Sequence, residues 1–303
     1  MNSIKCPKCG KGAIDSYCDG GMMGLEEVID MYRCRSCGHR WENQPKKHIV
    51  FYSGGLGSFL AGYYVAKYNP SLHIKFLFTD TLIEDEDLYR FLDEVVAYYK
   101  NVELVKITEG RTPWEVFKDV RLLGNSRQDP CSRILKREIA KKWVKTHYAP
   151  SDCFLYFGID WTELHRCEAI ERHWSPYVCR FPIIEHKITD RHRTALEILS
   201  RFKIEPPRLY KMGFHHNNCG GFCIKAGQGQ FAVLLKQLPE RYQEHERQEQ
   251  AMREHLKKDV AIMKDRKGGN TTPLTMRHFR ESVQAGCRQI DMLDIGGCGC
   301  FTE

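Results

Sequence analysis

The chain has 303 residues, 42% of them hydrophobic and 28% charged, and its net charge of +7 is compatible with a polyanionic partner. Because no apolar run approaches the roughly 18 residues of a membrane span, a membrane protein is excluded, and we expect a cytoplasmic protein without a signal peptide. Its 14 cysteines are then expected to stay reduced and to serve metal or redox chemistry instead of disulfides.

Two cysteine pairs with CxxC spacing stand near the N-terminus, Cys6 with Cys9 and Cys34 with Cys37. Each pair can place two thiolates on one tetrahedral ion, and four sulfur ligands are typical of structural zinc. The segment has few apolar side chains, so a bound ion would supply much of its folding free energy. We therefore predict a zinc ribbon over residues 1–45.

The predicted ribbon also carries basic and aromatic side chains that suit contacts to phosphates and bases. They are Arg33, Arg35, His39, Arg40 and Trp41. A tRNA or a DNA is therefore a candidate partner of the ribbon, and a purely structural appendage is the alternative.

An apolar strand over 49–52 runs directly into the glycine-rich turn SGGLGS, and apolar residues at helical spacing follow. A strand, a glycine loop and a helix N-terminus together present backbone N–H groups and a positive helix end to a phosphate. The loop is not a Walker A motif, because no Gly-Lys-Ser/Thr follows. The predicted phosphate ligands are Ser53, Gly54, Gly55, Leu56, Gly57 and Ser58.

Strand-like and helix-like segments alternate over residues 46–234. Strands are expected at 73–80, 102–108 and 153–160, and helices at 84–99, 112–120 and 134–148. This alternation predicts an α/β fold, a doubly wound parallel sheet with helices on both faces. Ligands of such sheets bind at the carboxyl ends of the strands.

The turn SGGLGS resembles the SGGxDS loop of the PP-loop ATP pyrophosphatases, with Gly57 where that family usually has Asp. Further segments are similar, in the same order, to motifs of the phosphoadenosine-phosphosulfate reductase-like branch of that superfamily. These segments are 78–95, 129–138, 158–166 and 206–223. The resemblance covers about residues 48–225 and implies an enzyme with the adenine nucleotide alpha hydrolase-like fold. Two departures are Leu82 in place of a Gly and Ser132 in place of a second Cys.

The resemblance implies an adenine-nucleotide site at the carboxyl ends of the strands. Asp80 would bind Mg²⁺ or a ribose hydroxyl and is a predicted catalytic residue. Further nucleotide contacts are predicted for Thr81, Arg133, Lys136, Gly158, Asp160, Glu163 and Arg166. A solvated helix face is the alternative for the basic residues of 133–137, and a surface ion pair is the alternative for the charged residues of 160–166.

The cysteines outside the ribbon form a second candidate set. In the iron–sulfur branch of the reductase-like family, a CC and a CxxC segment hold a [4Fe–4S] cluster, and a C-terminal cysteine performs thiol chemistry. This chain has Cys131, Cys219 and Cys223 in the corresponding segments, and Cys298 is the predicted fourth ligand. A second zinc and metal-free redox thiols are the alternatives. Cys298 and Cys300 are also the predicted catalytic thiols.

Residues 235–303 are predicted to form a helical extension with a Cys-rich tail. We expect a long charged helix over 235–265, a loop at 266–273, a short helix at 275–286 and a mobile tail from 287.

Three functions follow from these features. The first is ATP- and Mg²⁺-dependent adenylation of a nucleic-acid base or a nucleotide, followed by sulfur transfer from a sulfur donor. The second is reduction of an adenylyl sulfate by a C-terminal cysteine and a thiol reductant. The third, suggested by Gly57, is a catalytically silent nucleic-acid-binding protein with a zinc ribbon.

Overall fold

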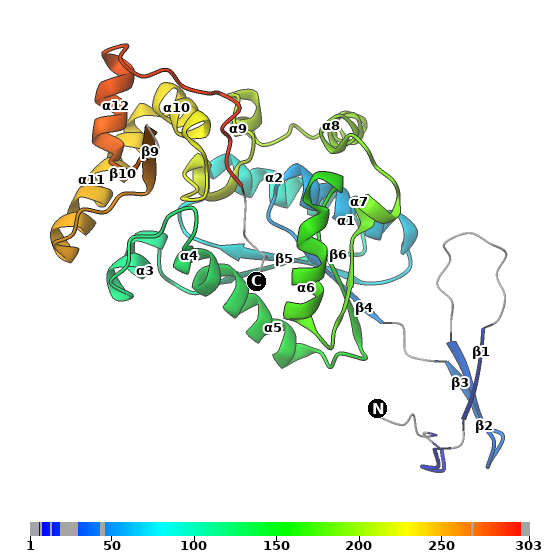
Figure 1. Ribbon diagram of the computed structural model, residues 1–303. Coiled ribbons are helices and arrows are strands. Elements are labelled where there is room, and N and C mark those ends of the chain that lie inside the picture. The colour runs from blue at the N-terminus through cyan, green and yellow to red at the C-terminus, as the bar shows by residue number, and fades with distance from the viewer. Residues whose placement is uncertain are drawn as a thin grey trace.

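The computed structural model describes residues 6, 8–12, 14–18, 30–42, 46–267 and 270–297. Its largest sheet has five parallel strands in the order β6-β5-β4-β7-β8 (Figure 1). The strands are β4 (Lys47–Phe51), β5 (Ile74–Asp80), β6 (Val102–Thr108), β7 (Cys153–Tyr156) and β8 (Val178–Arg180). The chain adds β5 and β6 on one side of β4 and then returns to add β7 and β8 on the other. This confirms the predicted doubly wound sheet, and the reversal between β4 and β7 marks the crevice at which such sheets bind ligands.

Side chains of the central strand β4 alternate between two hydrophobic cores. Val50 packs with Phe76 on one face of the sheet, whereas Ile49 and Phe51 pack with Leu155 on the opposite face. A parallel strand that is buried on both faces has to be apolar throughout. This explains why the segment shows no alternation of polar and apolar residues.

Helices cover both faces of the sheet. One core is shared by α1 (Leu56–Tyr68), α2 (Glu86–Ala97), α7 (Pro182–Glu185) and α8 (Arg191–Phe202). The opposite core is shared by α5 (Ile139–His147) and α6 (Cys167–Trp174). Helix α2 begins later than expected, because the Asp85 side chain caps it by accepting a hydrogen bond from the Asp87 backbone N–H at 3.1 Å.

The basic helix expected at 134–148 is longer and less regular than predicted. It begins with α4 (Pro130–Ser132), continues as a π-helical segment (Arg133–Glu138) and only then becomes α5. A π-helical turn bonds residues five apart instead of four, which changes the angular spacing of the side chains. As a result Arg133 is exposed, whereas Lys136 is buried.

The C-terminal third builds a further core with the segment around α3 (Pro113–Asp119) and α4. Its elements are α9 (Arg208–Lys211), a 3-10 turn (Asn218–Gly221), α10 (Gln228–Gln237), α11 (Pro239–Leu256), β9 (Met263–Lys267), β10 (Asn270–Leu274) and α12 (Met276–Gln284). Trp114 of α3 packs in this core with Phe222, Phe231, Tyr242 and Phe279. The predicted boundary between 234 and 235 therefore lies inside one continuous core.

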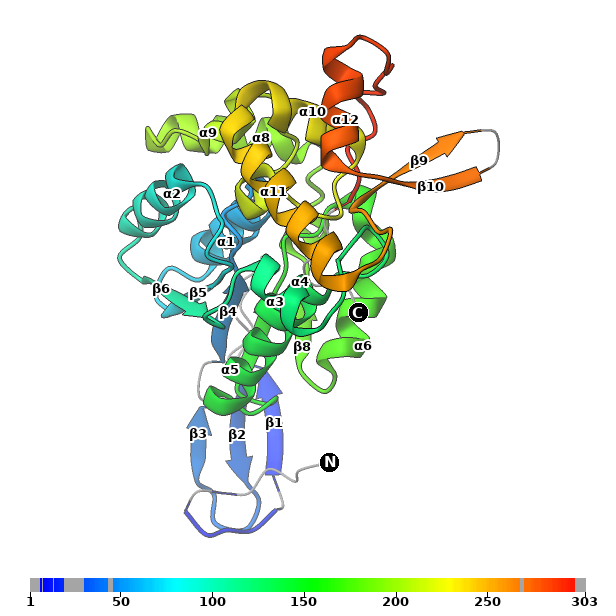
Figure 2. The ribbon, with the colours of Figure 1, turned by 90° about the vertical axis from the view of Figure 1, so that its left-hand side faces the viewer.

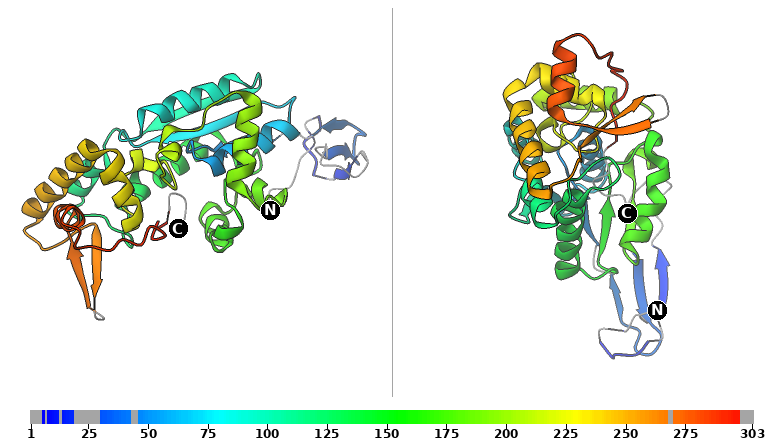
Figure 3. Two further views of the ribbon diagram at one scale, coloured as in Figure 1. Left: turned by 90° about the horizontal axis from the view of Figure 1, so that it is seen from above. Right: turned by 60° about the vertical axis from the view of Figure 1, so that its left-hand side comes forward.

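Two predictions for the C-terminal third are wrong. In the segment expected to be helical over 235–265, α11 begins at Pro239, a favourable residue for the first helical position, but the helix stops before 265, at Lys257 in a left-handed conformation (φ 52°). The loop expected at 266–273 instead contributes to an antiparallel hairpin of β9 and β10. Figures 2 and 3 show this hairpin projecting from the C-terminal helices.

The segment 287–297, expected to be mobile, is held against the start of α10. The Asp294 carbonyl oxygen accepts a hydrogen bond from the Gly229 N–H at 2.9 Å, and its carboxylate accepts one from the Gln228 N–H at 3.1 Å. A β-bridge pairs Ala226 with Gly296. The predicted catalytic residues Cys298 and Cys300 lie outside the described residues.

The N-terminal part forms a three-stranded antiparallel sheet in the order β1-β2-β3. Its strands are β1 (Ile14–Cys18), β2 (Asp30–Cys34) and β3 (Arg40–Glu42). Across the described parts of the chain, none of the helices has both the length and the hydropathy to cross a membrane.

Candidate functional site

A cavity of about 710 Å³ opens where β4 and β7 end. The glycine-rich loop, the segment after β7, the start of α8, the turn before α10 and the tail at 295–297 all contribute to its lining. Predicted ligands in this lining are Ser53, Gly55, Leu56, Gly57, Ser58, Gly158, Glu163 and Arg166. Six other predicted residues lie outside the lining: Gly54, Asp80, Thr81, Arg133, Lys136 and Asp160.

The loop is held in an open conformation by its own side chains. Gly54 has a φ of 75°, and a Cβ there would lie 2.2 Å from a methyl carbon of Leu88. The Ser53 hydroxyl accepts a hydrogen bond from the Gly55 N–H at 3.4 Å and lies 3.2 Å from the Ser58 hydroxyl. Helix α1 has 13 residues; its N-cap residue Gly55 offers no capping side chain, and only its first N–H, that of Leu56, is bound by a side chain, the Tyr210 hydroxyl at 3.2 Å. A helix start of this kind at a cavity is suited to bind an anion.

Gly57 has no room for the carboxylate that the resembling family usually places there. A Cβ on Gly57 would lie 2.8 Å from the Gly158 carbonyl oxygen, and a Cβ on Gly158 would lie 2.5 Å from the Gly57 carbonyl carbon. The loop and the end of β7 therefore meet backbone against backbone. The Arg191 side chain lies over the same spot, with its Cδ 3.6 Å from the Cβ position of Gly57.

A network of charges forms one wall of the cavity. Arg191 Nη1 lies 3.0 Å from an Asp160 oxygen and 3.5 Å from a Glu163 oxygen, and Glu163 also binds Arg166. The other Asp160 oxygen accepts hydrogen bonds from the backbone N–H and the hydroxyl of Thr162 at 2.9 and 2.6 Å. These residues are ion-paired, but Asp160 and Arg166 are buried, unlike the surface pair of the alternative, and Glu163, Arg166 and Arg191 all line the cavity.

Asp80 is not part of the cavity lining. Its two oxygens accept hydrogen bonds from the Tyr89 hydroxyl at 2.9 and 3.0 Å, and one also accepts from the Leu82 N–H at 2.8 Å. Burial and the neighbouring Asp80 carboxylate raise the pKa of Tyr89, so this hydroxyl stays protonated as a donor. Asp80 is thus engaged in fixing the turn after β5.

The carboxylates in and near the cavity, those of Glu163, Asp80 and Asp160, do not fit a magnesium site. Mg²⁺ on a nucleotide is usually bound through one or two carboxylates in addition to the phosphates. Glu163 is the one carboxylate among the described lining residues, and two arginines bind it. Asp80 and Asp160 are engaged elsewhere, as described above. The remaining charged and titratable lining is cationic or neutral: Arg166, Arg191, Lys225, His165, His192, His215 and His216.

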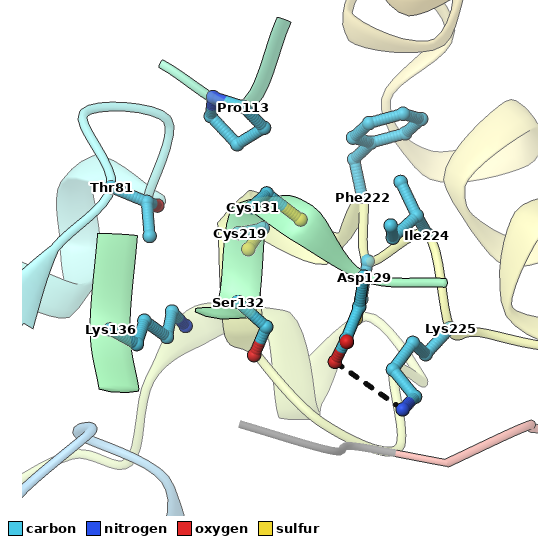
Figure 4. A pocket seen from close by; sticks show the side chains of 11 residues that line it. Thr81, Pro113, Asp129, Cys131, Ser132, Lys136, Cys219, Phe222, Ile224 and Lys225 are labelled. Carbon is cyan, nitrogen blue, oxygen red and sulfur yellow. Dashed lines mark hydrogen bonds and ion pairs between the residues drawn. The ribbon is translucent and has the colours of Figure 1, made fainter. Parts of the chain in front are cut away.

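The cysteines of the second set meet in a small pocket. Cys131 from α4 and Cys219 and Cys223 from the turn before α10 line about 20 Å³, beside Thr81 and Lys136 (Figure 4). This volume suits about one water molecule. The space does not fit a four-iron cluster, and the predicted fourth ligand Cys298 lies outside the described residues.

Buried charges support this cysteine pocket. Lys136 Nζ lies 3.7 Å from Glu84, and the two side chains are only 6% and 2% exposed. Glu84 also accepts hydrogen bonds from the Thr81 hydroxyl at 2.9 Å and from the Cys219 N–H at 2.6 Å. Cys219 has a φ of 53°, a conformation that costs about 1–3 kcal/mol outside glycine and often marks functional sites.

The basic residues of 133–137 are separated by the π-helical segment. Arg133 pairs with Glu138 at the surface at 2.6 Å, and Arg137 lies 3.3 Å from Asp129. Lys225 joins the two sites, because it lines both the cavity and the cysteine pocket and lies 3.4 Å from Asp129.

The four N-terminal cysteines form a candidate metal centre. The sulfurs of Cys6, Cys9, Cys34 and Cys37 all lie within 4.8 Å of one another. In each knuckle a backbone hydrogen bond of 2.8 Å links the glycine after the second cysteine to the first cysteine. Those glycines have φ values of 72° and 70°. Four sulfurs in this arrangement fit tetrahedral zinc, as the spacing predicts.

Several cavity residues were missed by the sequence analysis. Tyr210 accepts a hydrogen bond from the Leu56 N–H at 3.2 Å, and Asn217 donates one to the Gly54 carbonyl at 3.1 Å. Both lie in the predicted segment 206–223, whose similarity could have drawn attention to them. Arg191 lies in no segment that is similar to the family's motifs. It lines the cavity only because α8 approaches the glycine-rich loop in the folded chain.

The fold and the site define a doubly wound α/β protein with a glycine-rich loop at its switch point. Among solved structures, the chain is similar to the phosphoadenylyl-sulfate (PAPS) reductase from Candida auris in its phosphate complex. The identity is 16%, the TM-score is 0.40, and the match covers 56% of this chain and 79% of that one. No protein-family model and no curated protein matches the chain. A structural likeness of this degree defines neither a substrate nor a reaction for this chain.

Proposed function

We propose that the chain is an enzyme that binds an adenylyl sulfate in the cavity beside Ser53–Ser58 and reduces its sulfate with cysteine thiols. The observation that carries this proposal is the charge of the cavity. The start of α1 and several cationic side chains face it, and the only carboxylate in its described lining is bound by arginines. Such a cavity suits an anion that arrives without a metal ion.

Of the two nucleotide reactions that the sequence suggests, sulfonucleotide reduction therefore has the better support. Adenylation by ATP needs Mg²⁺ to neutralise the leaving pyrophosphate, and the carboxylates at this cavity do not fit that ion. An adenylyl sulfate, the mixed anhydride of AMP and sulfate, places fewer charges in the site than ATP. Arginine and histidine side chains and the start of α1 can bind them directly.

The position of the tail supports a thiol reaction at this cavity. Ile295, Gly296 and Gly297 line it, and Cys298 is the next residue in the sequence. In the proposed step a thiolate sulfur attacks the sulfate sulfur, the bond from that sulfur to the bridging oxygen breaks, and AMP leaves with the electron pair. A second thiol then attacks the S-sulfonated cysteine, releasing sulfite and leaving a disulfide that an external thiol reductant returns to the reduced state.

The experiment is a product assay on the full chain with adenosine 5′-phosphosulfate and a thiol reductant. Equal amounts of sulfite and AMP are expected, without added Mg²⁺. Release of AMP and pyrophosphate from ATP, with no sulfite from the sulfonucleotide, would instead establish the adenylation reaction.

A second candidate function is supported by the N-terminal cysteine cluster. A small-molecule reductase has no evident use for a zinc ribbon, and the exposed Arg33, Arg35 and Arg40 beside the cluster suit nucleic-acid phosphates. In this alternative the ribbon binds a tRNA or a DNA. Binding that weakens linearly with the logarithm of the salt concentration would support it, and no binding at 50 mM salt would exclude it.

A further inference from the structure

Two nitrogen atoms in the lining of the cavity lack hydrogen-bond partners within the described residues. They are Arg166 Nε and His216 Nε2, and both are shielded from water. A shielded polar group without a partner is unfavourable in a folded protein, so each such group needs an explanation. A bound ligand would supply the missing hydrogen-bond partners. Because Arg166 Nε can only donate, the ligand atom next to it has to be an acceptor.

The protonation state of His216 follows from its neighbour Gln230. The Gln230 side-chain nitrogen lies 3.3 Å from the Gly221 carbonyl oxygen and 3.2 Å from His216 Nδ1. A carbonyl oxygen can only accept, so the amide has to turn its NH₂ group toward it. The second hydrogen of that group then points to Nδ1, which has to accept.

Burial supports a neutral ring. Burial, together with the positive charges of Lys136 and Arg191, lowers the pKa of His216 from 6.5 to about 4. A neutral imidazole whose Nδ1 accepts carries its single proton on Nε2. His216 Nε2 is therefore a donor, as Arg166 Nε is.

The ring is also placed next to the glycine-rich loop. The neighbouring residue Asn217 donates a hydrogen bond to the Gly54 carbonyl, which ties the turn carrying His216 to the loop. Gln230 lies on α10, is 1% exposed and cannot turn to solvent.

We propose that His216, held by Gln230 with its proton on Nε2, is a neutral hydrogen-bond donor that recognises an anionic oxygen of the ligand in this cavity. The proposal rests on the proposed function and names a residue that determines specificity. The chemical class recognised is a phosphate or sulfate oxygen. Gln230 is a positioning residue, because it acts only through His216.

The test measures dissociation constants of the full chain by calorimetry, with adenosine 5′-phosphosulfate, AMP and inorganic phosphate as separate probes. His216→Phe removes the donor and keeps a planar ring. We expect it to weaken binding of adenosine 5′-phosphosulfate about 10- to 100-fold, the usual effect of losing a hydrogen bond to a charged group. His216→Gln, which keeps an N–H donor, should recover most of the affinity. The matched control His278→Gln, at an exposed position on α12, should bind like the wild type.

The three probes separate the possible sources of the anion. Equal losses with AMP and with adenosine 5′-phosphosulfate would place His216 at the phosphate, and a loss confined to the sulfonucleotide would place it at the sulfate. If the wild type binds no adenine nucleotide, the proposed function fails. The ratio of the dissociation constants of His216→Phe and the wild type for inorganic phosphate still decides the role of His216. Binding by His216→Phe equal to the wild type with every probe would overturn the proposal.

A second readout does not depend on any ligand. Long-range ¹H–¹⁵N NMR should show His216 with a bare Nδ1 and a protonated Nε2 near neutral pH. In Gln230→Glu the carboxylate can only accept, so Nδ1 has to become protonated, and the spectrum should change to the other tautomer or to the cation. A His216 signal that is identical in this variant and in the wild type would contradict the role given to Gln230. Thermal unfolding of each variant confirms that it is folded.

Discussion

Gly57 marks the contact between the loop and the end of β7. The position lacks side-chain space, since the Gly158 carbonyl oxygen lies 2.8 Å from where a Cβ would stand. The close backbone contact with Gly158 therefore explains why this chain has Gly57 where the family that it resembles usually has Asp. Arg191 occupies the neighbouring space and supplies positive charge where the family usually has a carboxylate.

Gly57→Asp should destabilise the protein without producing a magnesium site. Forcing a side chain into this contact is expected to lower the free energy of unfolding by about 1–3 kcal/mol, the usual effect of overpacking. Urea denaturation measures it. Gly297→Ala, where no atom lies within 4 Å of the added Cβ, is the matched control and should be as stable as the wild type. A fully stable Gly57→Asp variant with Mg²⁺-dependent nucleotide binding would refute this explanation of Gly57.

His245 should make the stability of the protein sensitive to acid. Its Nδ1 accepts a hydrogen bond from the Trp114 indole N–H at 3.0 Å, and its ring stacks on Phe222 with centroids 3.6 Å apart. Burial and the nearby Arg241 lower its pKa from 6.5 to about 3. The unfolded state therefore binds a proton more readily, and stability should fall as the pH drops from about 6.5 toward 3, by on the order of 3 kcal/mol.

The measurement is the free energy of unfolding against pH for the wild type and for His245→Phe. The variant should be less stable near pH 7, because the Trp114 N–H loses its acceptor, by about 1–3 kcal/mol. Its stability should also fall less steeply in acid. His278→Gln serves again as the control. Parallel profiles for the wild type and His245→Phe would show that His245 is not the buried neutral group described.

At the residue scale, the sequence predicted those ligands whose role is local. The loop Ser53–Ser58 could be predicted because glycines after an apolar strand signal it directly, and all of its residues except Gly54 line the cavity. Arg191 and Gln230 were not found, because their roles depend on contacts that only the folded chain creates. Asp80 was placed correctly at a strand end, but its partner Tyr89 could not be read from the pattern.

At the scale of elements, the start of α10 and the C-terminal segment act as one unit. The Asp294 side chain accepts a hydrogen bond from the Gln228 N–H, and the backbone carbonyl of Asp294 accepts one from Gly229. A Cβ on Gly227 would lie 2.2 Å from Asp294. The segment therefore fits the helix start closely, and this contact sets where the chain approaches the cavity.

Asp294→Ala should separate nucleotide binding from turnover. Loss of the cap removes about 1 kcal/mol from the docking of the tail, so sulfite formation should fall about fivefold or more while the affinity for AMP changes less than threefold. Asp291→Ala is the control, because Asp291 caps only its own turn at Leu293. Steady-state rates and calorimetry measure the two effects. An unchanged rate would show that docking of this segment has no part in catalysis.

The N-terminal cluster should bind one zinc ion per chain. Cys9→Ser removes one of four sulfurs and should lower the zinc content measured by mass spectrometry by more than half. Chelation should unfold the ribbon, because its folding depends on the ion. Cys287→Ser, at an exposed cysteine outside the cluster, should retain full zinc. A zinc content that does not change in Cys9→Ser would contradict the assignment.

The prediction of elements succeeded where a hydrophobic pattern was strong. The strand at 102–108 and the helix capped by Thr112 agree with the structure because alternation and the cap are local signals. The β9–β10 hairpin was missed because its charged sequence, Met263–Lys267, continues the polar pattern of α11. The π-helical segment was also missed, since no local pattern distinguishes it from an α-helix.

At the scale of the whole molecule, the fold places the cavity beside the glycine-rich loop and the cysteine pocket next to each other. The sheet positions the loop at its switch point, and the C-terminal core holds the cysteine pocket against α4. Lys225 lines both the cavity and that pocket. The doubly wound fold could be predicted because alternating strands and helices determine it. The packing of the C-terminal third against α3 could not be predicted from the sequence, because it depends on long-range contacts of residues such as Trp114 and Phe279.

The most direct test of the central claim is a product assay with adenosine 5′-phosphosulfate and a thiol reductant in a buffer without Mg²⁺. No chelator is added, so the zinc of the N-terminal cluster is not removed and the assay asks only whether the cavity acts on a nucleotide without Mg²⁺. We predict sulfite and AMP in equal amounts, at a rate that added Mg²⁺ does not increase. No sulfite under these conditions, together with Mg²⁺-dependent release of pyrophosphate from ATP, would contradict the account.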